Sequence, residues 1–228
     1  MINKTNIKLF KLFLIFYIIY LLFLRGNLKN ISHYVKYFIC KLFNINFNQS
    51  NITISDEILF HVINNIKKIK QLENKKKLKF IDFGCGDGYI LFKINKLFNS
   101  IDGIEIDKKT SMTTSKKLSN FNNVHIFNMD MTYYQFELTD SILFLFEPLF
   151  LLNKKKAKFI YHTIFNNINN IWKNTQFSLY IIYVSGLVRQ DITPSFLKQY
   201  NFIPINKIQC CSLCLNRNMF IYKYKLNK

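Results

Sequence analysis

The chain has 228 residues, of which half are hydrophobic and 17% are aromatic, so it is long enough to bury a sizeable core. Intrinsic disorder is excluded, because it needs low hydrophobicity as well as high charge. The formal net charge of +19 suggests a nucleic acid or an anionic membrane as the partner. Only three of the 32 basic residues are Arg, however, and Arg is favoured for bidentate phosphate and base contacts. We therefore attribute most of the charge to an AT-rich coding sequence, and nucleic-acid binding is not the favoured interpretation.

Residues 12–24 form an uninterrupted apolar run, preceded by Lys8 and Lys11 and followed by Arg25. A membrane-spanning helix needs about 20 apolar residues, so the run lies between a signal-peptide core and a short membrane helix. No small-residue cleavage site follows it, and the flanking cations could reach both interfaces. We predict that residues 1–26 are a membrane anchor, with an organelle-targeting segment as the alternative. Cations flank both ends, so they do not indicate the orientation.

Residues 27–75 are predicted to be a basic connection that contains helices. Residues 32–43 could form an amphipathic helix at a membrane surface. A second helix is predicted over residues 55–72, where Ser55 is a candidate N-cap and acidic residues occupy the first turn.

From residue 78 onward, short apolar runs alternate with amphipathic segments. The predicted strands are 78–83, 101–106, 124–129, 141–146 and 177–184, and the predicted helices are 88–98, 108–119 and 154–172. This alternation indicates a parallel sheet that is covered by helices on both faces.

The end of the chain changes character. A short helix is predicted over residues 194–200, followed by an antiparallel hairpin with strands 207–215 and 219–225 and a turn at residues 216–218. The predicted fold class is therefore α/β: a Rossmann-like open sheet, mostly parallel, with an antiparallel C-terminal hairpin. We assign this domain to residues 76–228 and expect an N-terminal apolar helix before it.

The loop after the first predicted strand has the sequence Asp82-Phe83-Gly84-Cys85-Gly86-Asp87-Gly88. Ligands of open α/β sheets bind at the carboxyl ends of the strands. Glycines there allow a tight turn and a close approach of the backbone to a ligand. The dinucleotide fingerprint G-x-G-x-x-G is excluded, because Tyr89 occupies the place of its last glycine.

This D-x-G-x-G-x-G pattern resembles motif I of the class I, seven-strand S-adenosylmethionine-dependent methyltransferases. Three further features match: Glu105 at the end of the second strand, Asp130 at the end of the third, and Glu147-Pro148-Leu149-Phe150 after the fourth. The resemblance covers about residues 76–228 and implies that the chain is an enzyme with S-adenosylmethionine as its cofactor.

The resemblance also implies a role for each residue. Asp82, Gly84, Gly86 and Gly88 would surround the methionine part of the cofactor, Glu105 would accept hydrogen bonds from the ribose hydroxyls, and Asp130 would accept from the adenine amino group. Glu147, Pro148 and Phe150 would face the methyl acceptor as the catalytic residues.

Simple chemistry agrees with these roles. A carboxylate at Glu105 can accept two hydrogen bonds from a cis-diol. Phe127, Met129 or Met131 offers apolar surface to a purine. Three acids also have simpler interpretations: Asp107 as a helix N-cap, which we favour, Asp87 as a turn residue and Asp130 as a strand-end Asx residue.

The segment after the fourth predicted strand bears on the methyl acceptor. Amino-methyltransferases of this family often carry Asn/Asp-Pro-Pro-Tyr/Phe after the fourth strand, and Glu147-Pro148-Leu149-Phe150 departs from that motif. The departure weakens the hypothesis that the acceptor is a nucleic-acid base, although Glu147 could hold an amine. The small domain and the apolar N-terminal segment loosely resemble membrane-associated protein-lysine methyltransferases. We therefore predict a protein amine as the acceptor, with a small molecule or RNA as the alternative. A cofactor-binding but inactive subunit, or a membrane-tethered scaffold, is a third hypothesis.

Cys210, Cys211 and Cys214 form a C-C-x-x-C group, but a structural zinc site needs four ligands and no second group is present. We interpret them as strand residues and predict no metal. The odd number of cysteines, with Cys85 in the glycine loop, favours a reducing compartment, either the cytoplasm or the mitochondrial matrix.

Overall fold

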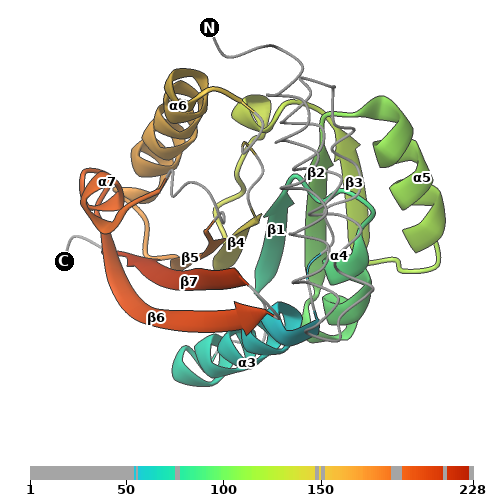
Figure 1. Ribbon diagram of the computed structural model, residues 1–228, viewed down its shortest axis with the longest axis horizontal. Helices are drawn as coiled ribbons and strands as arrows, with labels where there is room; N and C mark the ends of the chain where they lie inside the picture. Colours follow the sequence, from blue (N-terminus) through green and yellow to red (C-terminus); the bar gives the residue numbers. More distant parts are fainter. Residues whose placement is uncertain are drawn as a thin grey trace, which may run out of the picture. The chain divides into compact units, whose positions relative to one another are not determined.

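The computed structural model describes residues 54, 56–74, 78–146, 149, 152–185, 192–212 and 215–225, with only the backbone at 210–212, 215 and 216. These residues belong to one compact unit that spans residues 53–228. The unit is a seven-stranded sheet with helices on both faces (Figure 1).

The strand order is β3-β2-β1-β4-β5-β7-β6. Strands β1 to β5 run parallel, and β7 is antiparallel to both of its neighbours. The predicted parallel sheet and its antiparallel C-terminal hairpin are therefore confirmed. The strands are β1 (Lys79–Phe83), β2 (Ser100–Glu105), β3 (Val124–Asn128), β4 (Ser141–Phe146), β5 (Leu179–Val184), β6 (Phe202–Ser212) and β7 (Leu215–Tyr224).

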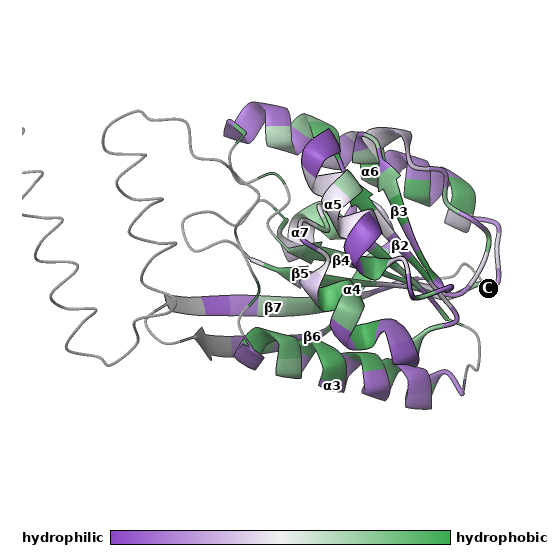
Figure 2. Cartoon of the chain, turned by 90° about the vertical axis from the view of Figure 1, so that its right-hand side faces the viewer, coloured by the Kyte–Doolittle hydropathy of each residue, from purple (hydrophilic) through white to green (hydrophobic). Residues whose placement is uncertain are grey.

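The central strands are mostly apolar because both of their faces are covered. Every residue of β1 and of β5 is buried. The edge strand β3 is only partly buried: Val124 and Ile126 are half-buried, and the other three residues are exposed. In Figure 2 the hydrophobic colour accordingly gathers in the central strands, whereas α3 (Asp56–Leu72) shows both colours.

Two groups of helices cover the sheet. Helices α6 (Lys154–Trp172) and α7 (Pro194–Lys198) pack on one face, with Trp172 and Phe196 in the core. On the other face lie α3, α4 (Tyr89–Ile94) and α5 (Lys108–Leu118). The predicted helices are thus present, although the segment after β1 ends as a 3-10 turn, η2 (Asn95–Leu97).

Helix α3 belongs to the same packed unit as the sheet. Its buried stripe recurs every three or four residues and joins the core beneath β1 and β4. Its first turn holds Asp56 and Glu57, as the sequence predicted, and these acids complement the positive end of the helix dipole. Ser55, the candidate N-cap, lies outside the described residues.

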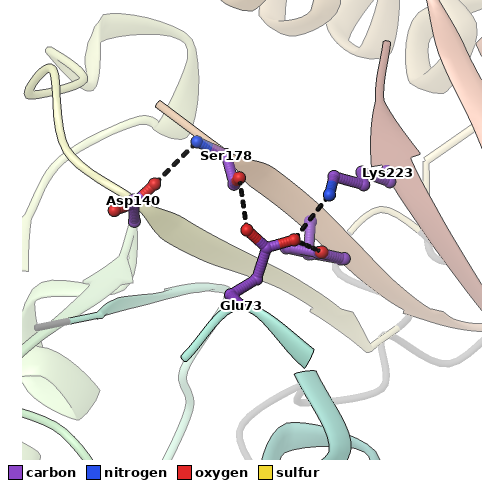
Figure 3. A network of polar contacts seen from close by, with 5 residues as sticks. Glu73, Asp140, Ser178 and Lys223 are labelled. Carbon is purple, nitrogen blue, oxygen red and sulfur yellow. Dashed lines mark hydrogen bonds and ion pairs between the residues drawn. The ribbon is translucent and has the colours of Figure 1, made fainter. Parts of the chain in front are cut away.

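A polar network fixes the end of α3 to the sheet (Figure 3). The Glu73 carboxylate accepts hydrogen bonds from Ser178 Oγ at 2.9 Å and from the Tyr180 hydroxyl, and it forms an ion pair with Lys223. The amide of Ser178 donates to Asp140 Oδ1 at 2.7 Å. Burial raises the pKa of Glu73, but the hydrogen bonds from Lys223, Tyr180 and Ser178 outweigh it and lower that pKa overall.

The turn of the C-terminal hairpin is not where the sequence placed it. Residues 216–218 lie inside β7, where Arg217 pairs with Cys210, and β6 begins at Phe202 instead of residue 207. Strand β6 contains Pro204, which an edge strand tolerates, and its register shifts between Pro204 and Asn206. Arg217 is buried with its guanidinium carbon 5.0 Å from the centre of the Phe146 ring.

Several predictions fall on residues that the structure does not describe. They include the anchor at 1–26, the amphipathic helix at 32–43, and the acceptor-loop residues Glu147, Pro148 and Phe150. Within the described ranges, no helix is both long and apolar enough to cross a bilayer.

Candidate functional site

The glycine loop is held between β1 and β2 by its own backbone. The amides of Gly84 and Cys85 donate to the Ile104 carbonyl at 2.9 and 3.1 Å, and the amide of Gly88 donates to the Cys85 carbonyl at 2.9 Å. Two bonds to one carbonyl of β2 turn the chain sharply at the carboxyl end of β1. The loop therefore lies at the edge of the sheet where open α/β folds bind ligands.

Glu105, the last residue of β2, connects to this loop through its side chain. Its Oε2 accepts from the amide of Gly86 at 3.0 Å, and its Oε1 accepts from the amide of Asp107 at 2.9 Å. A carboxylate has about four acceptor positions, so both oxygens can accept a further hydrogen bond. Asn128 Nδ2 donates to the carbonyls of Glu105 and Ile106, each at 3.0 Å, which fixes this end of β2 to β3.

Gly86 and Gly88 differ in what surrounds them. Both have positive φ, +54° at Gly86 and +70° at Gly88. A Cβ at Gly86 would enter open space, whereas a Cβ at Gly88 would lie 2.7 Å from Thr114 Cγ2 and 2.8 Å from Leu118 Cδ1. Gly88 therefore serves the packing of the loop on α5, and Gly86 leaves its backbone open for a ligand.

Thr114 is a site residue that the sequence reading missed. Its hydroxyl donates to the Gly86 carbonyl at 2.6 Å, although the two residues are 28 positions apart in the sequence. The sequence reading also missed Asn128. A threonine in a helix and an asparagine at a strand end carry no local signal of such contacts.

Asp82, at the start of the loop motif, is 2% exposed. Burial, followed by the charge of Glu105, raises the pKa of Asp82 to about 8. Burial also raises the pKa of the Cys85 thiol well above its usual value. The inner side of the loop therefore disfavours negative charge unless a cation neutralises it.

The remaining acids make local hydrogen bonds. Asp107 Oδ1 accepts from the amide of Thr110 at 2.8 Å, so Asp107 is the N-cap of α5, as the sequence favoured. Asp87 Oδ1 accepts from the amide of Tyr89 at 3.1 Å and stabilises the turn.

Asp130 caps the 3-10 turn η3 (Met131–Tyr133), and its Oδ1 accepts from Thr132 N and Oγ1 at 2.9 and 2.8 Å. Its Oδ2 makes no hydrogen bond to the described residues, so that oxygen is available to a ligand. Because Glu105 pairs with Asn128 in the parallel register, Asp130 lies just beyond the carboxyl ends of β2 and β3.

The apolar surface near these acids differs in part from the expectation. Phe127 is partly exposed, but Met129 and Met131 are half-buried and pack against the core under α6. Ile106, which directly follows Glu105, is 67% exposed, and Tyr133 is 75% exposed. Ile106 and Phe127 are therefore better candidates than the methionines for contact with a flat ring.

Within the described part of the chain, no three His, Cys, Asp or Glu side chains are grouped so that they could bind a metal. The side chains of Cys210, Cys211 and Cys214 lie outside that part.

No known family model matches the sequence. A stretch of 91 residues is 31% identical to an rRNA adenine N-6-methyltransferase of Limosilactobacillus reuteri. That stretch is 39% of this chain and only 36% of the length of that relative.

Solved structures resemble a larger part of the chain. Magnesium protoporphyrin IX methyltransferase of Synechocystis, solved with bound S-adenosylmethionine, matches 88% of this chain and 99% of its own, with a TM-score of 0.57 and 14% identity. The N-methyltransferase NodS of Bradyrhizobium japonicum matches 75% of this chain and 99% of its own, with a TM-score of 0.55 and 10% identity. The chain therefore has the fold of the class I, seven-strand S-adenosylmethionine-dependent methyltransferases.

Proposed function

We propose that the chain is an S-adenosylmethionine-dependent methyltransferase. The observation that carries the proposal is the arrangement at Glu105, whose carboxylate is hydrogen-bonded to the Gly86 amide beside a backbone open to a ligand. A fixed carboxylate with spare acceptor positions suits the cis-diol of a ribose. The fold, the glycine loop and the acids at three strand ends support the same cofactor.

The cofactor would supply a methyl group on a positively charged sulfur, and the chain would bind and orient it. The backbone at Gly84 and Gly86 would admit the methionine part, and Gly88 would hold the loop against α5. Asp82, which is buried and pairs with no cation among the described residues, would become ionised beside the ammonium group. Asp130 Oδ2 would accept from the adenine amino group while Ile106 and Phe127 contact the ring.

The acceptor is a separate part of the proposal. A protein amine held by Glu147, with Pro148 and Phe150 beside it, was the sequence hypothesis, and membrane association through residues 1–26 belongs to the same hypothesis. The comparisons lend no support to that acceptor. RNA is the acceptor that a specific observation favours, because the curated protein with 31% identity over 91 residues is named for rRNA adenine. We therefore place RNA first and a protein amine second.

The first test measures cofactor binding by the full chain. Calorimetry should detect binding of S-adenosylhomocysteine. The Glu105→Gln variant should bind it at least tenfold more weakly, because a hydrogen bond to a charged acceptor contributes about 1.5–3 kcal/mol. Glu57→Gln removes a carboxylate from the first turn of α3 and should leave the affinity unchanged. Equal affinity of the Glu105→Gln variant and the parent would remove Glu105 from the site.

The second test identifies the acceptor. The full chain is incubated with a host lysate and methyl-labelled cofactor, and RNA, protein and small molecules are then separated. Label in RNA is expected. Label confined to protein would restore the protein-amine hypothesis and exclude RNA.

A further inference from the structure

We infer that the exposed face at the start of α6 is a binding surface for single-stranded RNA, which it holds beside the methyl-transfer site. This inference rests on the proposed methyltransferase activity and names a surface for its substrate. The surface, called the α6 patch below, consists of Lys154, Lys155, Lys156, Lys158 and Phe159.

The lysines of the α6 patch are unusual for their position. They fill four of the first five places of α6, all are exposed, and no acid occupies the first turn. None of them forms an ion pair with a described residue. Cations are disfavoured at a helix N-terminus, where the dipole is positive.

Helix α3 shows the opposite arrangement and serves as an internal comparison. It begins with Asp56 and Glu57, and its exposed Lys67 and Lys68 lie in its second half. Helix α5 also begins with two exposed lysines, but its N-cap is the acid Asp107, whereas α6 has four lysines in five places and the neutral N-cap Asn153. The start of α6 therefore carries more uncompensated positive charge than the start of α3 or α5. A polyanionic partner would offset the unfavourable charge of the α6 patch.

Phe159 supplies the second observation. Its side chain is 71% exposed, and its ring contacts no other aromatic ring of the described residues. Lys155 and Lys156 lie one turn before it on the same helix surface. Exposed aromatic rings on which bases stack, beside cations that contact phosphates, are the elements by which proteins bind single-stranded nucleic acid.

The position of the α6 patch connects it to the site. Helix α6 follows β4 by a short connection, so it begins at the carboxyl edge of the sheet, and it contacts η3, the turn capped by Asp130 (Figure 1). A strand of RNA bound on α6 would therefore lie near the edge that holds Glu105 and Asp130.

An anionic membrane is the competing partner for an exposed phenylalanine among lysines. A helix that lies on a membrane buries a broad apolar face in it. The apolar face of α6 is instead occupied by the protein core, through residues that include Tyr161, Phe165 and Trp172. One exposed ring with four lysines fits a base and its phosphates better.

The test compares two matched variants of the full chain. The first carries Lys155→Gln, Lys158→Gln and Phe159→Ala in the α6 patch. The control carries Lys67→Gln, Lys68→Gln and Phe60→Ala on α3, where Phe60 is 61% exposed. Both lose two positive charges and one exposed ring. The probe is a fluorescent 16-nucleotide single-stranded RNA of mixed sequence, titrated at several salt concentrations.

The α6 variant should bind the RNA at least tenfold more weakly, and its salt slope should fall by about 1.4 for two lysines. The control should stay within twofold of the parent. Phe159→Ala alone should lower the affinity for single-stranded RNA about tenfold but leave the affinity for the matching RNA duplex unchanged. Paired bases in a duplex are not free to stack on the Phe159 ring. Equal losses in the α6 variant and the control would overturn the inference.

Two further measurements separate the possible failures. S-adenosylhomocysteine affinity should be the same in the parent and both variants. If the cofactor binds but the α6 variant retains full RNA affinity, the inference fails and the proposed function stands. If the cofactor does not bind to the parent, the proposed function fails. Loss of binding to phosphatidylglycerol vesicles in the α6 variant, with RNA binding unchanged, would assign the α6 patch to a membrane.

Discussion

Glu105 and Gly86 are 19 residues apart, and one hydrogen bond of 3.0 Å joins them. Each residue was a candidate for cofactor binding from the sequence, but the sequence did not show that one holds the other. The bond explains why the strand-end acid and the glycine loop belong together, because the carboxylate sets the loop before any ligand arrives. Such pre-organisation reduces the entropy that binding must offset.

The two glycines next to this bond predict different mutant behaviour. Gly88→Ala should lower the free energy of unfolding by about 2–4 kcal/mol, since the methyl group meets Thr114 and Leu118 within 2.8 Å at a φ of +70°. Gly86→Ala should cost only about 1 kcal/mol, because its methyl group enters open space. Gly86→Ala should nevertheless lower the binding free energy of S-adenosylhomocysteine by more than it lowers the free energy of unfolding.

Urea denaturation and calorimetry on both variants check this contrast. Equal loss of stability in the two variants would contradict the geometry of the loop. Unchanged ligand affinity in Gly86→Ala would show that the open space above this glycine is not where the ligand lies.

Asp82 predicts a stability change that depends on pH. Its folded pKa of about 8 lies above the ordinary value of 3.8, because burial and then Glu105 disfavour its charge. The folded state therefore retains a proton that the unfolded state releases, and stability falls as pH rises between about 4 and 8. Asp82→Asn lacks this component, so it should be more stable than the parent at pH 8 and similar to it near pH 4.

Urea denaturation at pH 4, 6 and 8 measures the difference between the two proteins. A difference that stays constant with pH would show that Asp82 is ionised in the fold. The same Asp82→Asn variant should bind S-adenosylhomocysteine less tightly, since it cannot pair with an ammonium group.

At the scale of elements, the parallel part of the sheet was predictable and the hairpin was not. Strands β1, β4 and β5 are buried on both faces, so their sequences are short, mostly apolar runs with clear ends. Strand β6 is an edge strand with Pro204 and a shifted register, so its sequence carries turn signals inside a strand. Arg217 suggested an exposed turn, yet it is buried beside Phe146.

The sequence likewise predicted only some of the residues of the candidate site. The loop glycines and Glu105 were predictable because they are rare residues at strand ends. Thr114 was not, since its contact with Gly86 depends on how α5 packs against the loop. Contacts between elements, unlike the ends of elements, leave no periodic signal in the sequence.

The network around Glu73 joins the end of α3 to β5 and β7 and predicts an effect on acid stability. The folded pKa of Glu73 lies below its ordinary value of 4.5, so its contribution is complete above that value and is lost as pH falls through the folded pKa. Glu73→Gln should be about 1–2 kcal/mol less stable than the parent at pH 7, and the difference should shrink below pH 4.5.

Urea denaturation of both proteins from pH 7 to pH 3 provides the measurement. Glu137→Gln removes an exposed carboxylate that pairs with Lys79, and it serves as the control for general charge effects. A difference between Glu73→Gln and the parent that persists unchanged at pH 3 would mean that the charge of Glu73 is not what stabilises the fold.

For the whole molecule, the packed unit and the N-terminal apolar run make separate predictions. The described helices and strands form two cores on the two faces of one sheet, and α3 completes one of them. Cofactor binding, as proposed, involves residues of that unit. Membrane attachment, as the sequence predicts it, depends on residues 12–24, where each Leu, Ile or Phe would contribute about −0.3 to −0.6 kcal/mol to insertion.

Deleting residues 1–26 should therefore release the protein from membranes without changing its affinity for S-adenosylhomocysteine. A second variant, Ile18→Lys with Leu21→Lys, keeps the length of the chain but places two charges in the apolar run, and it should be released as well. Carbonate extraction of membranes measures attachment, and calorimetry on the released protein measures the affinity. Recovery of the unaltered chain in the soluble fraction would contradict the anchor. Retention of both variants on membranes would instead place attachment in another part of the chain, and vesicle binding by the α6 variant would then show whether α6 provides it.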